Sequence, residues 1–99
     1  MTDPTPTDPR ATTLVDTAWL AGRLDDPSIR IVDATWHMPN NGRTGAADYA
    51  AGHIPGAVFW DIDAISDPGT PLPHMLPDDE TFARHMEGLG ISNGTHVVV

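Results

Sequence analysis

Three short, mostly apolar runs alternate along this chain with segments that have the features of helices. The runs cover residues 29–32, 57–60 and 97–99, and the last of them is Val-Val-Val. Runs of this length are typical of strands that are buried on both faces of a parallel sheet. An order of strand, helix, strand, helix and strand predicts an α/β fold in which right-handed crossovers leave a parallel sheet flanked by helices.

Two shorter helices are expected in the first half of the chain. Asp16 can cap a helix that continues to residues 25–27, where Asp-Asp-Pro would end it. A second helix can cover residues 46–51 and end at Gly52. In the sequence, one of these helices would precede the first strand and the other would follow it.

The strongest helix pattern lies in the second half. Residues 78–80 (Asp-Asp-Glu) favour a helix amino terminus, and Gly90 can end the helix. One face of this helix would carry Phe82, Met86 and Leu89 at helical spacing. The proline-rich stretch before it, residues 61–77, predicts a long irregular connection.

The length allows one small domain. Residues 1–12 contain three prolines among threonines and aspartates, a composition that predicts a mobile leader, so the domain is expected at residues 13–99. The third apolar run reaches Val99 with no turn or polar tail after it. We therefore expect a domain truncated at its C-terminal side and a chain that is part of a longer protein.

Charge and hydropathy exclude two classes of partner. Fourteen acidic residues face five arginines and no lysine, and the net charge of −9 argues against a nucleic-acid partner. No apolar run approaches the length of a membrane span, and the amino terminus lacks the pattern of a signal peptide. A cytoplasmic protein without a membrane partner is expected.

Three motifs resemble a known family. Residues 52–57 read Gly-His-Ile-Pro-Gly-Ala, residues 61–67 read Asp-Ile-Asp-Ala-Ile-Ser-Asp, and residues 72–77 read Leu-Pro-His-Met-Leu-Pro. Together they resemble the first domain of two-domain sulfurtransferases of the rhodanese family, and the third motif is most similar to the mercaptopyruvate members. The resemblance extends from about Leu14 through the strand at residues 96–99 and implies a rhodanese-like fold.

The resemblance implies an enzyme that moves sulfur through a cysteine persulfide, yet this chain has no cysteine. The full-length protein is expected to take sulfur from 3-mercaptopyruvate or thiosulfate and pass it to a thiol or cyanide. Its catalytic cysteine would lie in a second rhodanese domain outside this chain. The chain alone is expected to be inactive, and neither a cofactor nor a metal is implied.

Two residues of these motifs are the candidate catalytic residues. In the family, the second aspartate of the Asp-Ile-Asp segment and the histidine between the two prolines reach toward the catalytic cysteine, and they correspond to Asp63 and His74. Histidine titrates near neutrality, and a carboxylate can orient it. Without the resemblance, the simplest interpretation of His74 is a loop histidine bonded to backbone.

Other polar residues have simpler interpretations. His53 is expected to hold the backbone of a Pro-Gly turn rather than to act in catalysis. Asp61 and Asp67 do not fit a calcium loop, because Ser66 and Leu72 stand where its Gly and Glu are needed, so both are expected to cap helices or turns. Arg43 is the one cation placed where it can meet an anion, although a surface arginine is the default.

Two functions remain open at this point. The chain can be the amino-terminal half of a sulfurtransferase, or a non-catalytic rhodanese-like module that binds a partner or supports a larger protein. The identity of the sulfur donor and acceptor and the oligomeric state are not encoded in these residues.

Overall fold

The first strand, β1 (Ile29–Asp33), is the centre of a three-stranded parallel sheet in the computed structural model, which describes residues 14–99. On one side β1 pairs with β2 (Val58–Phe59), with Val32 opposite Val58. On its other side it pairs with β3 (His96–Val98), with Ile31 opposite Val98. The expected leader at residues 1–12 lies outside the described residues.

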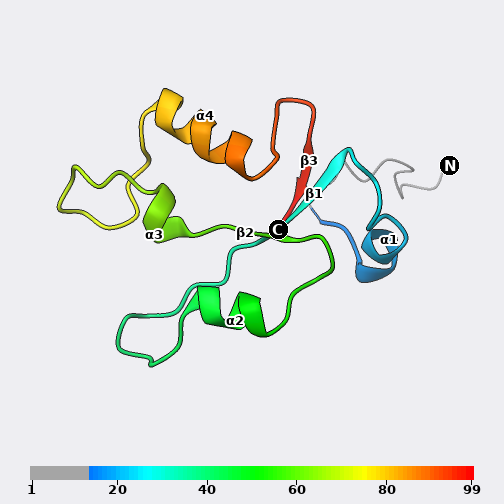
Figure 1. Cartoon of the computed structure of the whole chain (residues 1–99), viewed down its shortest axis with the longest axis horizontal. Helices are drawn as coiled ribbons and strands as arrows, with labels where there is room; N and C mark the ends of the chain where they lie inside the picture. The colour runs from blue at the N-terminus through cyan, green and yellow to red at the C-terminus, as the bar shows by residue number, and fades with distance from the viewer. Residues whose placement is uncertain (1–13) are drawn as a thin grey trace, which may run out of the picture.

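Four helices accompany the sheet: α1 (Thr17–Ala21), α2 (Gly45–Ala51), α3 (Ile62–Ile65) and α4 (Asp79–Gly88). The crossover through α2 leads from the central strand to one edge, and the crossover through α4 leads back across to the other edge. Crossovers between parallel strands are almost always right-handed, so the two helices are expected on opposite faces of the sheet. Figure 1 shows α2 and α4 on opposite sides of the strands. The expected α/β fold with a parallel sheet flanked by helices is confirmed.

The core is small and centres on β1. Ile29, Ile31 and Ala57 form a buried cluster, against which partly buried side chains pack from α1 and β3, namely Trp19, Leu20 and Val98. Met86 is buried on α4, as its helical spacing predicts. His85 beside it is half-buried.

Helix α1 is shorter than expected. The sequence predicts an end at residues 25–27, but the helix ends at Ala21 with Gly22 as its C-cap. Near this end, the Arg23 guanidinium donates a 3.0 Å hydrogen bond to the carbonyl of Trp19 and lies 4.4 Å from the centroid of that indole ring. One terminal carbonyl of the helix is thereby satisfied without another helical turn.

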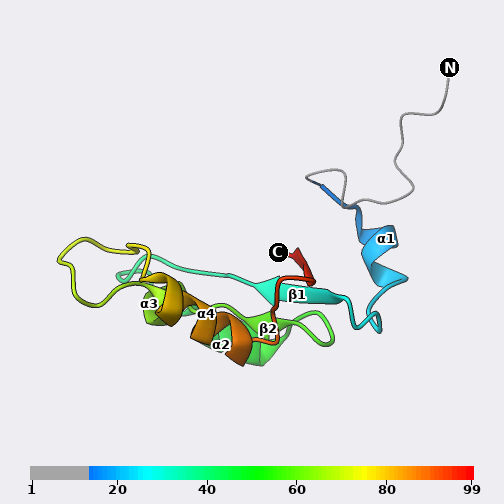
Figure 2. The same cartoon turned by 90° about the horizontal axis from the view of Figure 1, so that it is seen from above.

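The expected irregular connection after β2 contains helix α3, which the sequence pattern does not predict. Four residues are too few to show a helical period. The signal is the cap: the Asp61 side chain accepts hydrogen bonds from the backbone N–H groups of Asp63 and Ala64. Figure 2 shows α3 and the loop that follows it at the end of the molecule opposite α1. No helix among residues 14–99 is long and apolar enough to cross a membrane.

Candidate active site

The Pro-Gly turn before β2 is held by His53, as expected. Its Nδ1 donates a 2.6 Å hydrogen bond to the Tyr49 carbonyl at the end of α2, and the two rings stack with centroids 3.7 Å apart. Gly56 has a φ of 83°, a conformation that favours glycine. The Tyr49 hydroxyl donates to the carbonyl of Ala57 at 2.5 Å. His53 therefore fixes the path of the chain into the sheet.

The loop at residues 68–77 folds back onto the end of α3. The backbone N–H of Asp67 donates to the carbonyl of Met75 at 2.8 Å, and the Asp67 side chain accepts from the N–H of Gly69 at 2.8 Å. Asp61 and Asp67 thus cap a helix and a turn, which confirms their expected role. The return of the chain at Met75 brings the preceding residue, His74, next to α3.

His74 and Asp63 meet as a hydrogen-bonded pair. The distance from His74 Nε2 to Asp63 Oδ1 is 2.8 Å. The hydrogen bond from His74 lowers the pKa of Asp63 below its ordinary value, and a further bond from Trp36 adds to this effect. An ionised carboxylate can only accept, so His74 donates from Nε2 and its Nδ1 is left for other partners.

Trp36 completes this group from the segment that follows β1. Its indole Nε1 donates to Asp63 Oδ2 at 3.1 Å. Its ring meets the His74 ring edge to face, with centroids 5.0 Å apart and planes at 85°. Both oxygens of the Asp63 carboxylate are therefore occupied by different ring donors.

Backbone strain marks the position of His74. Its φ of 58° lies in the left-handed region, and His74 is the one non-glycine residue with a positive φ among residues 14–99. Such a conformation costs about 1–3 kcal/mol and persists only where the surroundings impose it. The hydrogen bond to Asp63 and the fold-back at Met75 are the contacts that impose it here.

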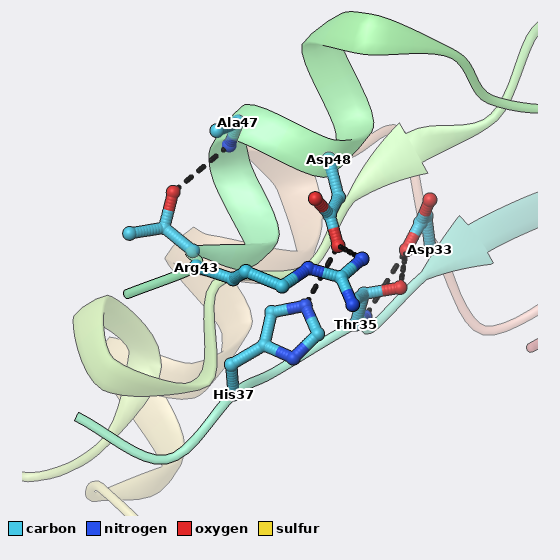
Figure 3. A network of polar contacts seen from close by, with 7 residues as sticks. Asp33, Thr35, His37, Arg43, Ala47 and Asp48 are labelled. Carbon is cyan, nitrogen blue, oxygen red and sulfur yellow. Dashed lines mark hydrogen bonds and ion pairs between the residues drawn. The ribbon is translucent and has the colours of Figure 1, made fainter. Parts of the chain in front are cut away.

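A second polar cluster lies on the same segment after β1 and joins it to α2. Asp48 Oδ2 receives His37 Nε2 and Arg43 Nη2, each at 2.7 Å. Figure 3 shows both side chains pointing at the Asp48 carboxylate, with Thr35 bonded to Asp33 nearby. Arg43 thus meets an anion of this chain, while most of its side chain stays exposed.

The Asp48 cluster predicts acid sensitivity. Hydrogen bonding from His37, with the nearby Arg43 charge, lowers the pKa of Asp48 from its ordinary value of 3.8. A lowered folded pKa contributes stability that is present above pH 3.8 and is lost as the pH falls through the folded value. We expect Asp48→Asn to lower the Tm at pH 6, and the difference from wild type to shrink on acidification toward pH 3.

Thermal unfolding of the full-length protein and its variants at the two pH values measures this effect. Asp25→Asn is the control, because Asp25 is exposed and lies outside the cluster. Its Tm difference should stay near zero at both pH values. An Asp48→Asn difference that is the same at pH 3 and pH 6 would contradict the assigned role of the carboxylate.

The family follows from a comparison with known domains. The protein-family model described as the rhodanese-like domain matches residues 16–99, which is most of the chain. This chain belongs to the rhodanese-like domain family. The expected resemblance is confirmed.

Relatives of this rhodanese-like domain include several sulfurtransferases. The 3-mercaptopyruvate sulfurtransferase of Escherichia coli K12 is 51% identical over 89 residues, which cover 89% of this chain and 32% of the relative. The mitochondrial thiosulfate/3-mercaptopyruvate sulfurtransferase 1 of Arabidopsis thaliana is 46% identical over 87% of this chain and 23% of the relative. The chain therefore spans about a third or less of the relatives that it matches.

Solved structures agree on the rhodanese fold. A crystal structure of the Escherichia coli enzyme, described as a 3-mercaptopyruvate sulfotransferase with a rhodanese fold, superimposes with a TM-score of 0.74 at 52% identity over 81% of this chain and 31% of that one. The sulfur transferase subunit of yeast mitochondrial complex I gives a TM-score of 0.80 at 38% identity over 89% of this chain and 29% of that one.

Sequence reasoning names two members of the group in this rhodanese-like domain and misses the third. His74 and Asp63 lie together at 2.8 Å, and Trp36, which none of the three motifs contains, is bonded to Asp63. Trp36 lies 27 positions from Asp63 in the sequence, and no local period connects them. The one sequence signal that points to Trp36 is an aromatic donor three positions after Asp33, the polar residue that ends β1.

Proposed function

We propose that this rhodanese-like domain is the amino-terminal part of a two-domain sulfurtransferase. The full-length protein would move sulfur from 3-mercaptopyruvate, or thiosulfate, to a thiol or cyanide through a cysteine persulfide. The cysteine must lie outside this chain, which contains none. The observation that carries the proposal is the His74–Asp63 hydrogen bond of 2.8 Å, made by the two residues that match the family's pocket.

The reaction with 3-mercaptopyruvate needs one proton to move twice. The cysteine thiol loses a proton, and the resulting thiolate attacks the sulfur of the donor. The new S–S bond forms as the C–S bond of the donor breaks. The electron pair of the C–S bond stays on the carbon and gives the enolate of pyruvate. Protonation of that carbon gives pyruvate and leaves the persulfide on the enzyme. The reaction balances without a cofactor or a metal.

His74 is suited to carry that proton. With Nε2 bonded to Asp63, Nδ1 is the atom that can accept the thiol proton and return it to the enolate. The Asp63 carboxylate would stabilise the imidazolium between the two transfers and hold the ring in one orientation. We therefore assign His74 the proton transfer and Asp63 the orientation of His74.

A second rhodanese domain is the proposed partner of this surface. The pair is open to solvent, since 29% of the His74 side chain and 66% of the Asp63 side chain are exposed. The loop that carries His74 also exposes the large apolar residues Leu72, Met75 and Leu76. Exposed large apolar residues close to polar ones are typical of a surface that another protein surface covers. Such cover would exclude water from the pocket.

The relatives leave two sulfur donors open. The bacterial relative at 51% identity is named for 3-mercaptopyruvate, and a mouse relative at 45% identity is a thiosulfate sulfurtransferase. We favour 3-mercaptopyruvate, because its enolate needs the proton that His74 can supply. Placement in the cytoplasm stays a prediction, since the Arabidopsis relative is named as mitochondrial.

Asp63→Asn in the full-length protein tests the orienting role. The amide keeps the shape of the carboxylate but loses its charge, so we expect kcat with 3-mercaptopyruvate to fall by about 10-fold, the size of one charged hydrogen bond. Steady-state formation of pyruvate measures the loss. His85→Ala is the control, because His85 lies on α4 outside the pair, and it should change kcat little. Wild-type kcat in a folded Asp63→Asn enzyme would contradict the proposed site.

A further inference from the structure

The Asp63 carboxylate is held by two donors from different parts of the chain. His74 Nε2 lies 2.8 Å from Oδ1, and Trp36 Nε1 lies 3.1 Å from Oδ2. The two ring donors also contact each other, with their centroids 5.0 Å apart. The three side chains therefore form a closed group in which each contacts the other two.

The bond from Trp36 limits a motion that His74 alone leaves free. With only one oxygen bound, an exposed carboxylate can rotate about its Cβ–Cγ bond. Its hydrogen bond to His74 can then be replaced by one to water. With its second oxygen bound to the Trp36 ring, the plane of the carboxylate is determined. Since Asp63 determines the orientation of His74, a fixed carboxylate also fixes the imidazole.

Trp36 is in turn held by its neighbours in the chain. Thr35 before it donates its hydroxyl to Asp33 at 2.7 Å, and His37 after it lies 2.7 Å from Asp48 on α2. The backbone on both sides of Trp36 is therefore tied to β1 and α2. A ring on such a segment can act as a fixed support for the loop that carries His74.

We propose that Trp36 is a positioning residue for sulfur transfer, whose indole N–H holds Asp63 so that Asp63 holds His74. This inference rests on the proposed function of the His74–Asp63 pair. It gives Trp36 a role that passes through Asp63 rather than one of packing against the sulfur donor. In the positioning role, loss of the indole N–H lowers kcat only while Asp63 is present. In a packing role, the loss of kcat would be the same without Asp63.

A double-mutant cycle in the full-length protein separates these roles. Trp36→Phe keeps an aromatic ring and removes the N–H, so we expect kcat with 3-mercaptopyruvate to fall by about 5- to 10-fold with KM unchanged. In an Asp63→Ala background the same change should alter kcat by less than about 2-fold, because the indole then has nothing to hold. An equal loss in both backgrounds, or a change in KM alone, would overturn the proposal.

The proton NMR signal of the indole N–H gives a readout that does not depend on activity. The Trp36 signal is identified by its loss in Trp36→Phe, and it should move when Asp63→Ala removes the acceptor. A signal that does not move would overturn the Trp36–Asp63 bond. If Asp63→Ala leaves kcat at the wild-type value, the proposed function fails, whereas a shifted indole signal in the same variant still supports the bond.

Trp19→Phe is the matched control for loss of an indole. Trp19 lies on α1, at the end of the molecule opposite α3 (Figure 2), and its buried Nε1 has no hydrogen-bond partner among residues 14–99. This variant should keep the wild-type kcat and the wild-type Trp36 signal. A loss of kcat equal to that of Trp36→Phe would overturn a specific role for Trp36.

Discussion

His74→Ala in the full-length protein should lower kcat with 3-mercaptopyruvate by about 100- to 10,000-fold, the range for a lost general acid or base. In the proposed mechanism, His74 accepts the thiol proton before the thiolate attacks and returns it to the enolate after the C–S bond breaks, so both transfers lose their carrier. Asp63, whose carboxylate lies 2.8 Å from His74, is proposed to orient it for these transfers. Steady-state pyruvate formation at saturating donor measures the loss.

Stability must be measured beside kcat, because His74 also occupies a left-handed backbone position with a φ of 58°. Alanine is not expected to favour that conformation, so a small decrease in Tm would accompany the substitution. His74→Asn tolerates the left-handed region better and cannot transfer the proton. We expect a Tm near the wild-type value and a kcat as low as that of His74→Ala. A wild-type kcat in a folded His74→Asn enzyme would remove the catalytic assignment.

Gly45→Ala should destabilise the protein by about 3 kcal/mol, at the upper end of the cost of forcing extra atoms into a packed site. Gly45 is the first residue of α2, and a Cβ there would lie 2.0 Å from the backbone oxygen of Thr35 and 3.2 Å from the Phe59 ring. A backbone oxygen cannot rotate away, so α2 or the segment after β1 must move. The shift of the urea midpoint at unchanged slope measures the loss.

Gly88→Ala is the matched control on α4. A Cβ at this position meets nothing within 4 Å, so the substitution adds a good helix former without a clash. We expect it to stabilise the protein by about 0.5–1 kcal/mol. Equal stability of the two variants would contradict the close packing of α2 against the Thr35 backbone.

The fold was predictable because its determinants are local. The runs at residues 29–32, 57–60 and 97–99 coincide with the three strands to within a residue or two at each end. The caps Asp16 and Asp78 were recognisable from residue type and spacing, and both side chains accept from the first turn of their helices. Strands and caps of this kind depend on residues close in sequence, so they can be predicted without knowing which distant residues meet.

What the sequence pattern could not predict depends on contacts between distant residues or on very short elements. Helix α3 has four residues, less than two turns, and shows no period. Helix α1 ends at Ala21, before the Asp-Asp-Pro stretch, and the Arg23 side chain bonds the Trp19 carbonyl there.

The candidate site shows the same limit. His74 and Asp63 were found through motifs that resemble a family, since they are 11 positions apart and no sequence pattern requires them to meet. Trp36 comes from a third segment, whose position is set by β1 and by the ties to α2. Only the folded chain brings these three residues together.

The most direct test of this account is the rate at which the full-length protein forms its persulfide in a single turnover. After rapid mixing with 3-mercaptopyruvate, the reaction is quenched with an alkylating reagent, and mass spectrometry follows the gain of one sulfur atom on a cysteine. We predict that the sulfur appears on a cysteine beyond residue 99 and that His74→Ala slows its appearance by the same factor as kcat. Persulfide formation at the wild-type rate in His74→Ala would contradict the account.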